Sequence, residues 1–248
     1  MLKEKKRTQV QPLLFTYDIP TLLAGDIILS TTDSDVSRVI RIATNCDYSH
    51  AMIYVRNNII HADDGGVFTT NPQRRLFRED QSIVLRYKYG TANQLLNICN
   101  HALNLSGSLY SVPEALLAKG LSNTRVKSTN QGQYCSRLVA QSYESQNIKI
   151  VNNSDYCTPA DILEFSDFIV VDNAIREARP EEIAISKKPD TTKIHQTHTF
   201  SWLKEVRKLA KTKRHDYIIS SISSALNYVA DFPEVDHEVL KKSGPLLI

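Results

Sequence analysis

The most regular feature of the sequence is a series of short apolar segments separated by turn-forming residues. Each has the length and the aliphatic or β-branched content that is typical of a buried β-strand. Between two of them, residues 56–58 supply turn chemistry and predict a hairpin. The predicted strands are residues 25–29, 50–55, 59–62, 67–69, 82–87 and 168–171.

A second pattern, apolar residues repeated at helical spacing, predicts helices between and after these strands. Asp33 or Ser34 can cap the first helix, and Thr158 can cap the last one, where Pro159 suits the first turn. The mixture of strands and helices indicates an α+β protein. The predicted helices are residues 34–44, 91–106, 113–119, 134–143 and 158–162.

The character of the chain changes after residue 172, where charged residues and prolines become frequent. We expect one compact domain with flanking segments, because the length suits a single good-sized domain with a small appendage. Two helical segments are predicted near residues 199–214 and 216–230. The expected parts are an N-terminal arm (1–20), the compact domain (21–172), a linker (173–198) and a helical C-terminal accessory segment (199–248).

Composition and charge exclude several classes of protein. The hydrophobic fraction of 42% and the charged fraction of 23% are ordinary for a soluble globular protein. A net charge of +3 is too small to indicate nucleic-acid binding, so we expect no nucleic-acid partner. No apolar run reaches the roughly 20 residues that span a bilayer, and the first residues contain no signal-peptide core. We expect synthesis in the cytosol; export by a specialised machine that needs no cleaved signal stays compatible with the sequence.

One of the four cysteines lies in a setting that suits a nucleophile. Cys135 stands where a polar loop is predicted to enter a helix. A helix N-terminus favours a thiolate, and its unpaired amides can bind the oxyanion of an acyl intermediate. The other three have weaker cases: Cys46 lies near a strand entry, Cys99 on an apolar helix face, and Cys157 just before a helix cap. No two cysteines form a CxxC pair, so the sequence does not indicate a zinc site or thioredoxin-type redox chemistry. We expect no cofactor.

Two histidines on the predicted hairpin are candidates for the base and its partner. His50 opens one strand, and His61 follows eleven residues later on the paired strand. A short hairpin would bring the two rings close enough for His61 to orient His50, as the third member of a triad orients the base. Taken singly, each histidine also suits a structural role. A metal site formed with Asp63 and Asp64 lacks a recognisable ligand spacing, so no metal is expected.

Four segments occur in an order that resembles a known family: residues 25–28, 48–55, 134–139 and 158–162. Together they resemble the circularly permuted branch of the NlpC and papain-like superfamily, the YiiX-like group, in which histidine-bearing strands precede the cysteine-bearing helix. The resemblance covers about residues 24–172. It implies an α+β, circularly permuted papain-like (NlpC-type) fold, with an antiparallel sheet packed against helices.

The same resemblance implies the roles of the candidate residues: Cys135 as nucleophile, His50 as base and His61 as the third polar residue. The spacing of the two histidines is also similar to that of the lecithin:retinol acyltransferase relatives. Those relatives have an Asn-Cys-Glu type of motif at the nucleophile, whereas this chain has Tyr134-Cys135-Ser136, which favours the hydrolase side. Tyr48 and Tyr134 flank the proposed site and are candidates for substrate binding, with aromatic packing as the alternative.

The C-terminal segment contains a basic cluster near Trp202 and Leu203. An amphipathic helix of this kind can meet a membrane surface or an acidic protein partner, or it can present a solvated face. The cluster contains one acid, Glu205, and the basic residues Lys204, Arg207, Lys208, Lys211, Lys213 and Arg214.

The sequence therefore predicts a cysteine-dependent hydrolase that cleaves an amide or peptide bond through an acyl-cysteine. The family resemblance implies a peptidoglycan peptide or an acyl-amide as the substrate. The alternatives are a lipid acyltransferase, thioesterase or phospholipase with the same site, and a binding module without chemistry.

Overall fold

The computed structural model describes residues 13–111, 115, 118 and 132–212 of the chain. Contacts divide the chain into two compact units, Met1–Ile194 and His195–Ile248. All of the site discussed below belongs to the first unit.

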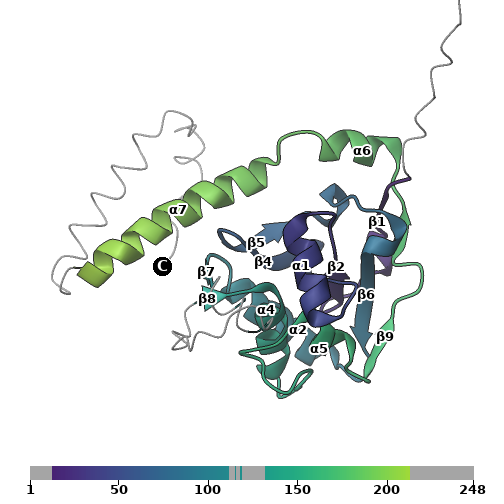
Figure 1. Ribbon diagram of the computed structural model, residues 1–248, viewed down its shortest axis with the longest axis horizontal. Helices are drawn as coiled ribbons and strands as arrows, with labels where there is room; N and C mark the ends of the chain where they lie inside the picture. Colours follow the sequence, from purple (N-terminus) through teal and green to yellow (C-terminus); the bar gives the residue numbers. More distant parts are fainter. Residues whose placement is uncertain (1–12, 112–114, 116–117, 119–131, 213–248) are drawn as a thin grey trace, which may run out of the picture. The chain divides into compact units, whose positions relative to one another are not determined.

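A six-stranded antiparallel sheet forms the centre of the first unit (Figure 1). Its spatial order is β5-β4-β3-β2-β6-β9. β2 therefore lies inside the sheet, although it is the first of these six strands along the chain. The sheet confirms all six predicted strands, with ends shifted by no more than two residues. The strands are β2 (Ile27–Ser30), β3 (His50–Val55), β4 (Asn58–Asp63), β5 (Gly66–Thr70), β6 (Ser82–Tyr87) and β9 (Phe168–Val170).

Both faces of this sheet are buried, which explains why its strands are apolar at nearly every position. Alternate residues of a strand point to opposite faces, and β2 follows this rule: Ile27 and Leu29 join one apolar cluster, while Ile28 joins the other. The first cluster also contains residues of the helices, such as Leu138 and Cys99. The second contains Tyr17 from the N-terminal segment.

Four helices agree with the predicted ones: α1 (Asp35–Thr44), α2 (Ala92–Asn104), α4 (Cys135–Glu144) and α5 (Pro159–Leu163). The last three contribute buried residues to the cluster on the first face. Ser34 caps α1 by accepting from the Ser37 amide at 3.2 Å, and Thr158 forms a capping box with Asp161. α4 packs on β3, β4 and α2, so its N-terminus lies against the hairpin that carries both histidines. The helix predicted over 113–119 falls largely outside the part that the structure describes.

The second face is covered by segments that the sequence analysis assigned to an arm and a linker. β1 (Phe15–Tyr17) pairs antiparallel with β10 (Ile175–Glu177), so residues from both ends of the unit form one small sheet. Tyr17 is buried and its hydroxyl lies 2.9 Å from Ser82 Oγ. Desolvation raises the pKa of Tyr17 to about 12. The arm and the linker therefore contribute to the folded unit, a difference from the expected boundaries.

The rest of the expected linker is helical. It contains α6 (Pro180–Ser186) and the start of α7 (Thr191–Thr212). The side chain of Glu182 accepts from Arg176 and Arg179, and the bond from Arg176 at 2.7 Å lowers the pKa of this carboxyl strongly. α7 includes most of the first predicted C-terminal helix, and the second, 216–230, lies outside the described residues. Within the described part of the chain, no helix is long and apolar enough to cross a membrane.

Candidate active site

Cys135 is the first residue of α4, as the sequence analysis predicted. The residue before it, Tyr134, is the N-cap, but no side chain caps the helix end. The amides and the dipole of a helix N-terminus favour an anion at this position. Cys135 is 2% exposed, and its exposed part lines a cavity. This placement provides the dipole and amides that a cysteine nucleophile requires.

A network of hydrogen bonds to main-chain oxygens holds this end of α4. The buried guanidinium of Arg137 donates to Asp155 O at 2.8 Å and 3.0 Å and to Gly132 O at 2.9 Å. The ring of Tyr134 lies beneath it, with 5.0 Å between the guanidinium carbon and the ring centre. The Tyr134 hydroxyl donates to the same Asp155 oxygen at 2.8 Å. These contacts fix the nucleophile's helix against the loop around Asp155.

The hairpin of β3 and β4 brings the two histidines together, as its length predicted. Its paired residues run from Val55 opposite Asn58 to Ile53 opposite Ile60. His50 and His61 lie beyond these pairs, toward the open end of the hairpin. His50 Nε2 lies 3.1 Å from His61 Nδ1, and the rings meet edge to face. His61 is 2% exposed and is therefore held firmly behind His50.

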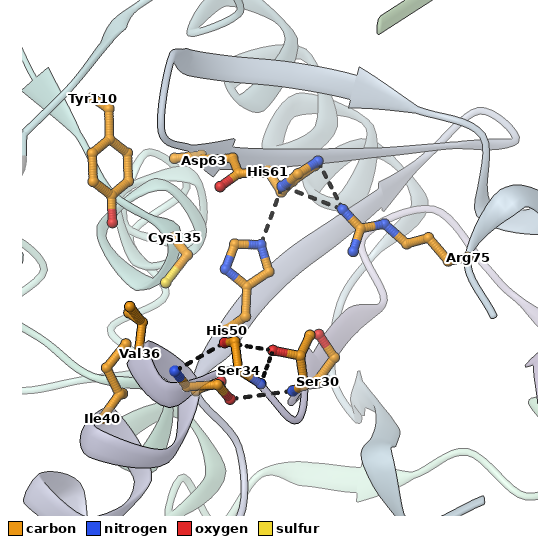
Figure 2. Close-up of a pocket in the computed structure, with 14 residues that line it drawn as sticks. Ser30, Ser34, Val36, Ile40, His50, His61, Asp63, Arg75, Tyr110 and Cys135 are labelled. Atoms are coloured by element: carbon orange, nitrogen blue, oxygen red, sulfur yellow. Dashed lines mark hydrogen bonds between the residues drawn. The ribbon is translucent and has the colours of Figure 1, made fainter. Parts of the chain in front are cut away.

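Cys135, His50 and His61 line one cavity of about 260 Å³. Figure 2 shows the His50 ring between the other two side chains. The ring nitrogen that does not bond to His61 is turned to the side where the Cys135 sulfur lies. The predicted nucleophile, base and third residue thus meet in one place. α4 contributes the first, and adjacent strands contribute the other two.

A residue that the sequence analysis did not consider, Arg75, contacts the far side of His61. Its Nη2 lies 2.9 Å from His61 Nε2 and 3.4 Å from His61 Nδ1. Burial, and then the positive charge of Arg75, lowers the pKa of His61 well below its ordinary value, with smaller contributions from His50 and Lys193. His61 is therefore neutral at neutral pH and carries one ring proton.

That single proton decides what His50 can do. When His50 Nε2 donates to His61 Nδ1, His50 Nδ1 has the lone pair that can take a proton from Cys135. When His61 Nδ1 donates instead, His61 Nε2 accepts from Arg75, and His50 carries its proton on Nδ1. Because a guanidinium only donates, the Arg75 contact favours the second direction.

Tyr110 is a second cavity residue that the sequence analysis did not identify. It lies in β7 (Leu109–Tyr110), which pairs with β8 (Gly132–Gln133) directly before Cys135. Figure 2 shows its hydroxyl end directed toward Cys135. Burial raises the pKa of Tyr110, and nearby Cys135 and Asp63 raise it further. The phenol therefore stays protonated and can donate a hydrogen bond.

The two tyrosines predicted to flank the site do not line this cavity. The Tyr134 hydroxyl donates to Asp155 O and accepts from the Cys157 amide at 3.1 Å, so it is engaged inside the domain. Tyr48 is half-buried and packs against the main apolar cluster. Both therefore take the aromatic packing role that the sequence analysis kept as the alternative.

The other cysteines lie away from the cavity. Cys99 is buried in the core, where desolvation raises its pKa to about 11. Burial also raises the pKa values of Cys46 and Cys157. Among the residues that the structure describes, no three His, Cys, Asp or Glu side chains gather closely enough to hold a metal ion.

No signal in the sequence singles out Arg75 or Tyr110. Arg75 follows a single-turn helix (Pro72–Arg74) in an irregular connection between strands, and Tyr110 lies on a strand of two residues. Neither belongs to a periodic segment, so only the tertiary arrangement brings them to the site.

The chain matches a protein-family model and is similar to a solved structure. The family model of the permuted papain-like amidase enzymes (YaeF/YiiX, C92 family) matches residues 21–160. The crystal structure of metalloprotein yiiX from Escherichia coli O157:H7 is similar at 18% sequence identity and a TM-score of 0.49, over 62% of this chain and 98% of that chain. No curated protein matches the chain significantly. The family match includes both histidines and Cys135.

Proposed function

We propose, because the chain belongs to the permuted papain-like amidase family, that it cleaves an amide bond through an acyl intermediate on Cys135. Family membership establishes a papain-like cysteine amidase; the roles of the individual residues are our proposal. One observation carries these roles: Cys135, at the N-terminus of α4, shares a cavity with the hydrogen-bonded pair of His50 and His61.

In the first half of the reaction, His50 acts in the form whose Nε2 donates to His61 Nδ1. Its Nδ1 takes the proton of the Cys135 thiol, and the thiolate attacks the carbonyl carbon. A carbon–sulfur bond forms and the carbonyl oxygen becomes an oxyanion. The N-terminus of α4 and the protonated Tyr110 hydroxyl, which both lie at the cavity, are the groups that we propose to stabilise it. His50 then gives its proton to the departing nitrogen, the carbon–nitrogen bond breaks, and a free amine leaves.

In the second half, water replaces the amine. His50 removes a proton from water as its oxygen attacks the thioester carbon. The carbon–sulfur bond then breaks and returns the electron pair to sulfur, and His50 returns the proton. The products are a carboxylic acid and the starting enzyme. His61 acts through His50 by keeping its ring in this orientation.

The substrate class that we propose is a peptide or an acyl-amide, of which a peptidoglycan peptide is one example. The size of the cavity, about 260 Å³, supports a substrate that places a small group beside the scissile bond. We also propose that the basic face of α7 binds a membrane surface or an acidic protein. Its side chains include Lys204, Arg207 and Lys208.

The experiment that tests the proposal is alkylation of Cys135 by iodoacetamide as a function of pH, read by peptide mass spectrometry. We expect selective labelling of Cys135 at neutral pH or below in the wild type, and its loss in His50→Ala. His101→Ala is the matched control, because His101 is a half-buried histidine that does not line the cavity. Labelling of Cys135 no faster than that of Cys46 in the folded protein contradicts an activated nucleophile.

A further inference from the structure

Arg75 is a cation without a counter-charge in the described part of the structure. It lines the cavity, and its hydrogen bonds within the described residues go to His61, a neutral ring. No described carboxylate forms an ion pair with it. Its Nε is buried and has no hydrogen-bond partner. Burial lowers the pKa of the guanidinium, because the charged form loses contact with water. Arg75 as a whole is half-buried. A partly buried charge without a counter-charge is less favourable than one that a ligand compensates.

The two other titratable groups that act on Arg75 do not supply this compensation. Tyr17 and Asp63 both raise its pKa. Tyr17 has a raised pKa of about 12 and is a neutral phenol at neutral pH. Asp63 is exposed, lines the same cavity and forms no ion pair with Arg75 in the part of the chain that the structure describes.

Hydroxyl groups form the wall of the cavity below Arg75 in Figure 2. Ser37 Oγ and Ser49 Oγ are engaged with each other at 2.7 Å, and Thr32 with Ser34 at 2.9 Å. Ser30 also lines the cavity. A guanidinium beside hydroxyl donors is the set that binds an oxyanion.

We propose that Arg75 binds a carboxylate of the amide substrate, next to the scissile bond, and so determines substrate specificity. This inference rests on the proposed function for the position of the scissile bond. The ligand class is an amide or peptide with an acidic group close to the cleaved carbonyl. The carboxylate accepts from the guanidinium, and the Ser30 hydroxyl on the cavity wall is a second donor that we propose for it.

Such a ligand would also act on the catalytic pair. The positive charge of Arg75 opposes protonation of His61 and favours donation from His61 to His50. A bound carboxylate offsets that charge and accepts the Arg75 hydrogens. His61 Nδ1 is then better able to accept from His50 Nε2, which is the direction in which His50 can take the Cys135 proton. An anionic substrate would thus favour the active form of the base.

The test uses pairs of alkylating probes that differ only in charge: iodoacetate with iodoacetamide, and N-iodoacetylglycine with N-iodoacetylglycinamide. For each pair, the ratio of anionic to neutral labelling rates of Cys135 is divided by the same ratio for free N-acetylcysteine. We expect the longer pair to give a normalised ratio above one in the wild type, and Arg75→Met to lower it about fivefold or more.

Arg74→Met is the matched control, since Arg74 is adjacent, contacts Lys188 O and Asp190, and does not line the cavity. Its ratio should equal that of the wild type. Arg75→Lys retains the charge without the planar fork and should give an intermediate ratio. A normalised ratio at or below one for the longer probe pair in the wild type overturns the proposal. This outcome can be read even when Arg75→Met does not fold.

A second measurement separates this proposal from that of the nucleophile. N-acetylglycine is titrated into the protein while the arginine side-chain Nε–H signals are followed by NMR. A shift confined to the Arg75 signal supports the carboxylate site even when Cys135 reacts with no probe. No shift of that signal at high ligand concentration overturns the site, whatever the reactivity of Cys135.

Discussion

His50 Nε2 lies 3.1 Å from His61 Nδ1, although the two residues lie outside the paired part of their hairpin. Each histidine is instead paired with an outer neighbour: His50 with Ser30 of β2, and His61 with Phe68 of β5. The contact between the rings is therefore set by the sheet as a whole, and four strands hold it. This is a rigid support for the ring that we propose as the base.

The first prediction concerns the third residue. His61→Ala removes the partner of His50 and should lower kcat about 10- to 100-fold, because the ring of the base is no longer held. His61→Asn keeps a side-chain oxygen that can accept from His50 and should retain more activity than His61→Ala. Steady-state kinetics on an amide substrate, with unfolding curves for both variants, checks this. Equal activity of the alanine variant and the wild type would show that His61 has no role in the reaction.

The second prediction concerns the pH dependence of stability. The folded-state pKa of His61 lies well below its unfolded value of about 6.5. The unfolded chain therefore binds the proton more readily, and the free energy of unfolding should fall as the pH falls below about 6.5. This one group contributes up to about 1.4 kcal/mol per pH unit.

Urea unfolding at a series of pH values measures this effect. His101 also has a lowered pKa and contributes in the same direction. The contribution of His61 is therefore isolated by comparing the wild type with His61→Asn. The free energy of unfolding of His61→Asn should decline less steeply between neutral and mildly acidic pH. Parallel curves for the two proteins would contradict a neutral His61.

The third prediction concerns Tyr110. Tyr110→Phe removes the hydroxyl that faces Cys135 and should lower kcat about 10- to 100-fold with little change in KM, because an oxyanion donor acts mainly in the transition state. The alkylation rate of Cys135 should change little. As a control, Tyr87→Phe alters a tyrosine that packs among aromatic rings away from the cavity. Unchanged activity of Tyr110→Phe together with a loss of activity in Tyr87→Phe would point to aromatic packing and not to an oxyanion donor.

The fourth prediction concerns the support of the nucleophile. Arg137→Met removes three hydrogen bonds and leaves the oxygens of Gly132 and Asp155 without these donors. We expect the free energy of unfolding to fall by about 2–4 kcal/mol. Thermal unfolding and denaturant titration measure the loss. Arg38→Met is the control, since the ion pair of Arg38 with Asp35 is exposed and should contribute less than about 1 kcal/mol.

The sequence by itself determined the local elements that carry the proposed chemistry. Continuous apolar runs predicted β3 and β4, because strands that are buried on both faces are apolar at nearly every position. Polar residues at the helix entries predicted where α1 and α5 begin. The start of a helix at Cys135 and the closeness of His50 to His61 followed from equally local rules.

Only the tertiary structure decided which residues complete the site and which close the fold. β1 and β10 have three residues each and pair with one another although they are far apart in the sequence. Strands this short show no hydrophobic periodicity in the sequence. Arg75 and Tyr110 reach the cavity from irregular segments, whereas Tyr134, the neighbour of Cys135, turns inward to Asp155 O. Sequence patterns report local periodicity and burial, but contacts between distant irregular segments depend on how the whole chain packs.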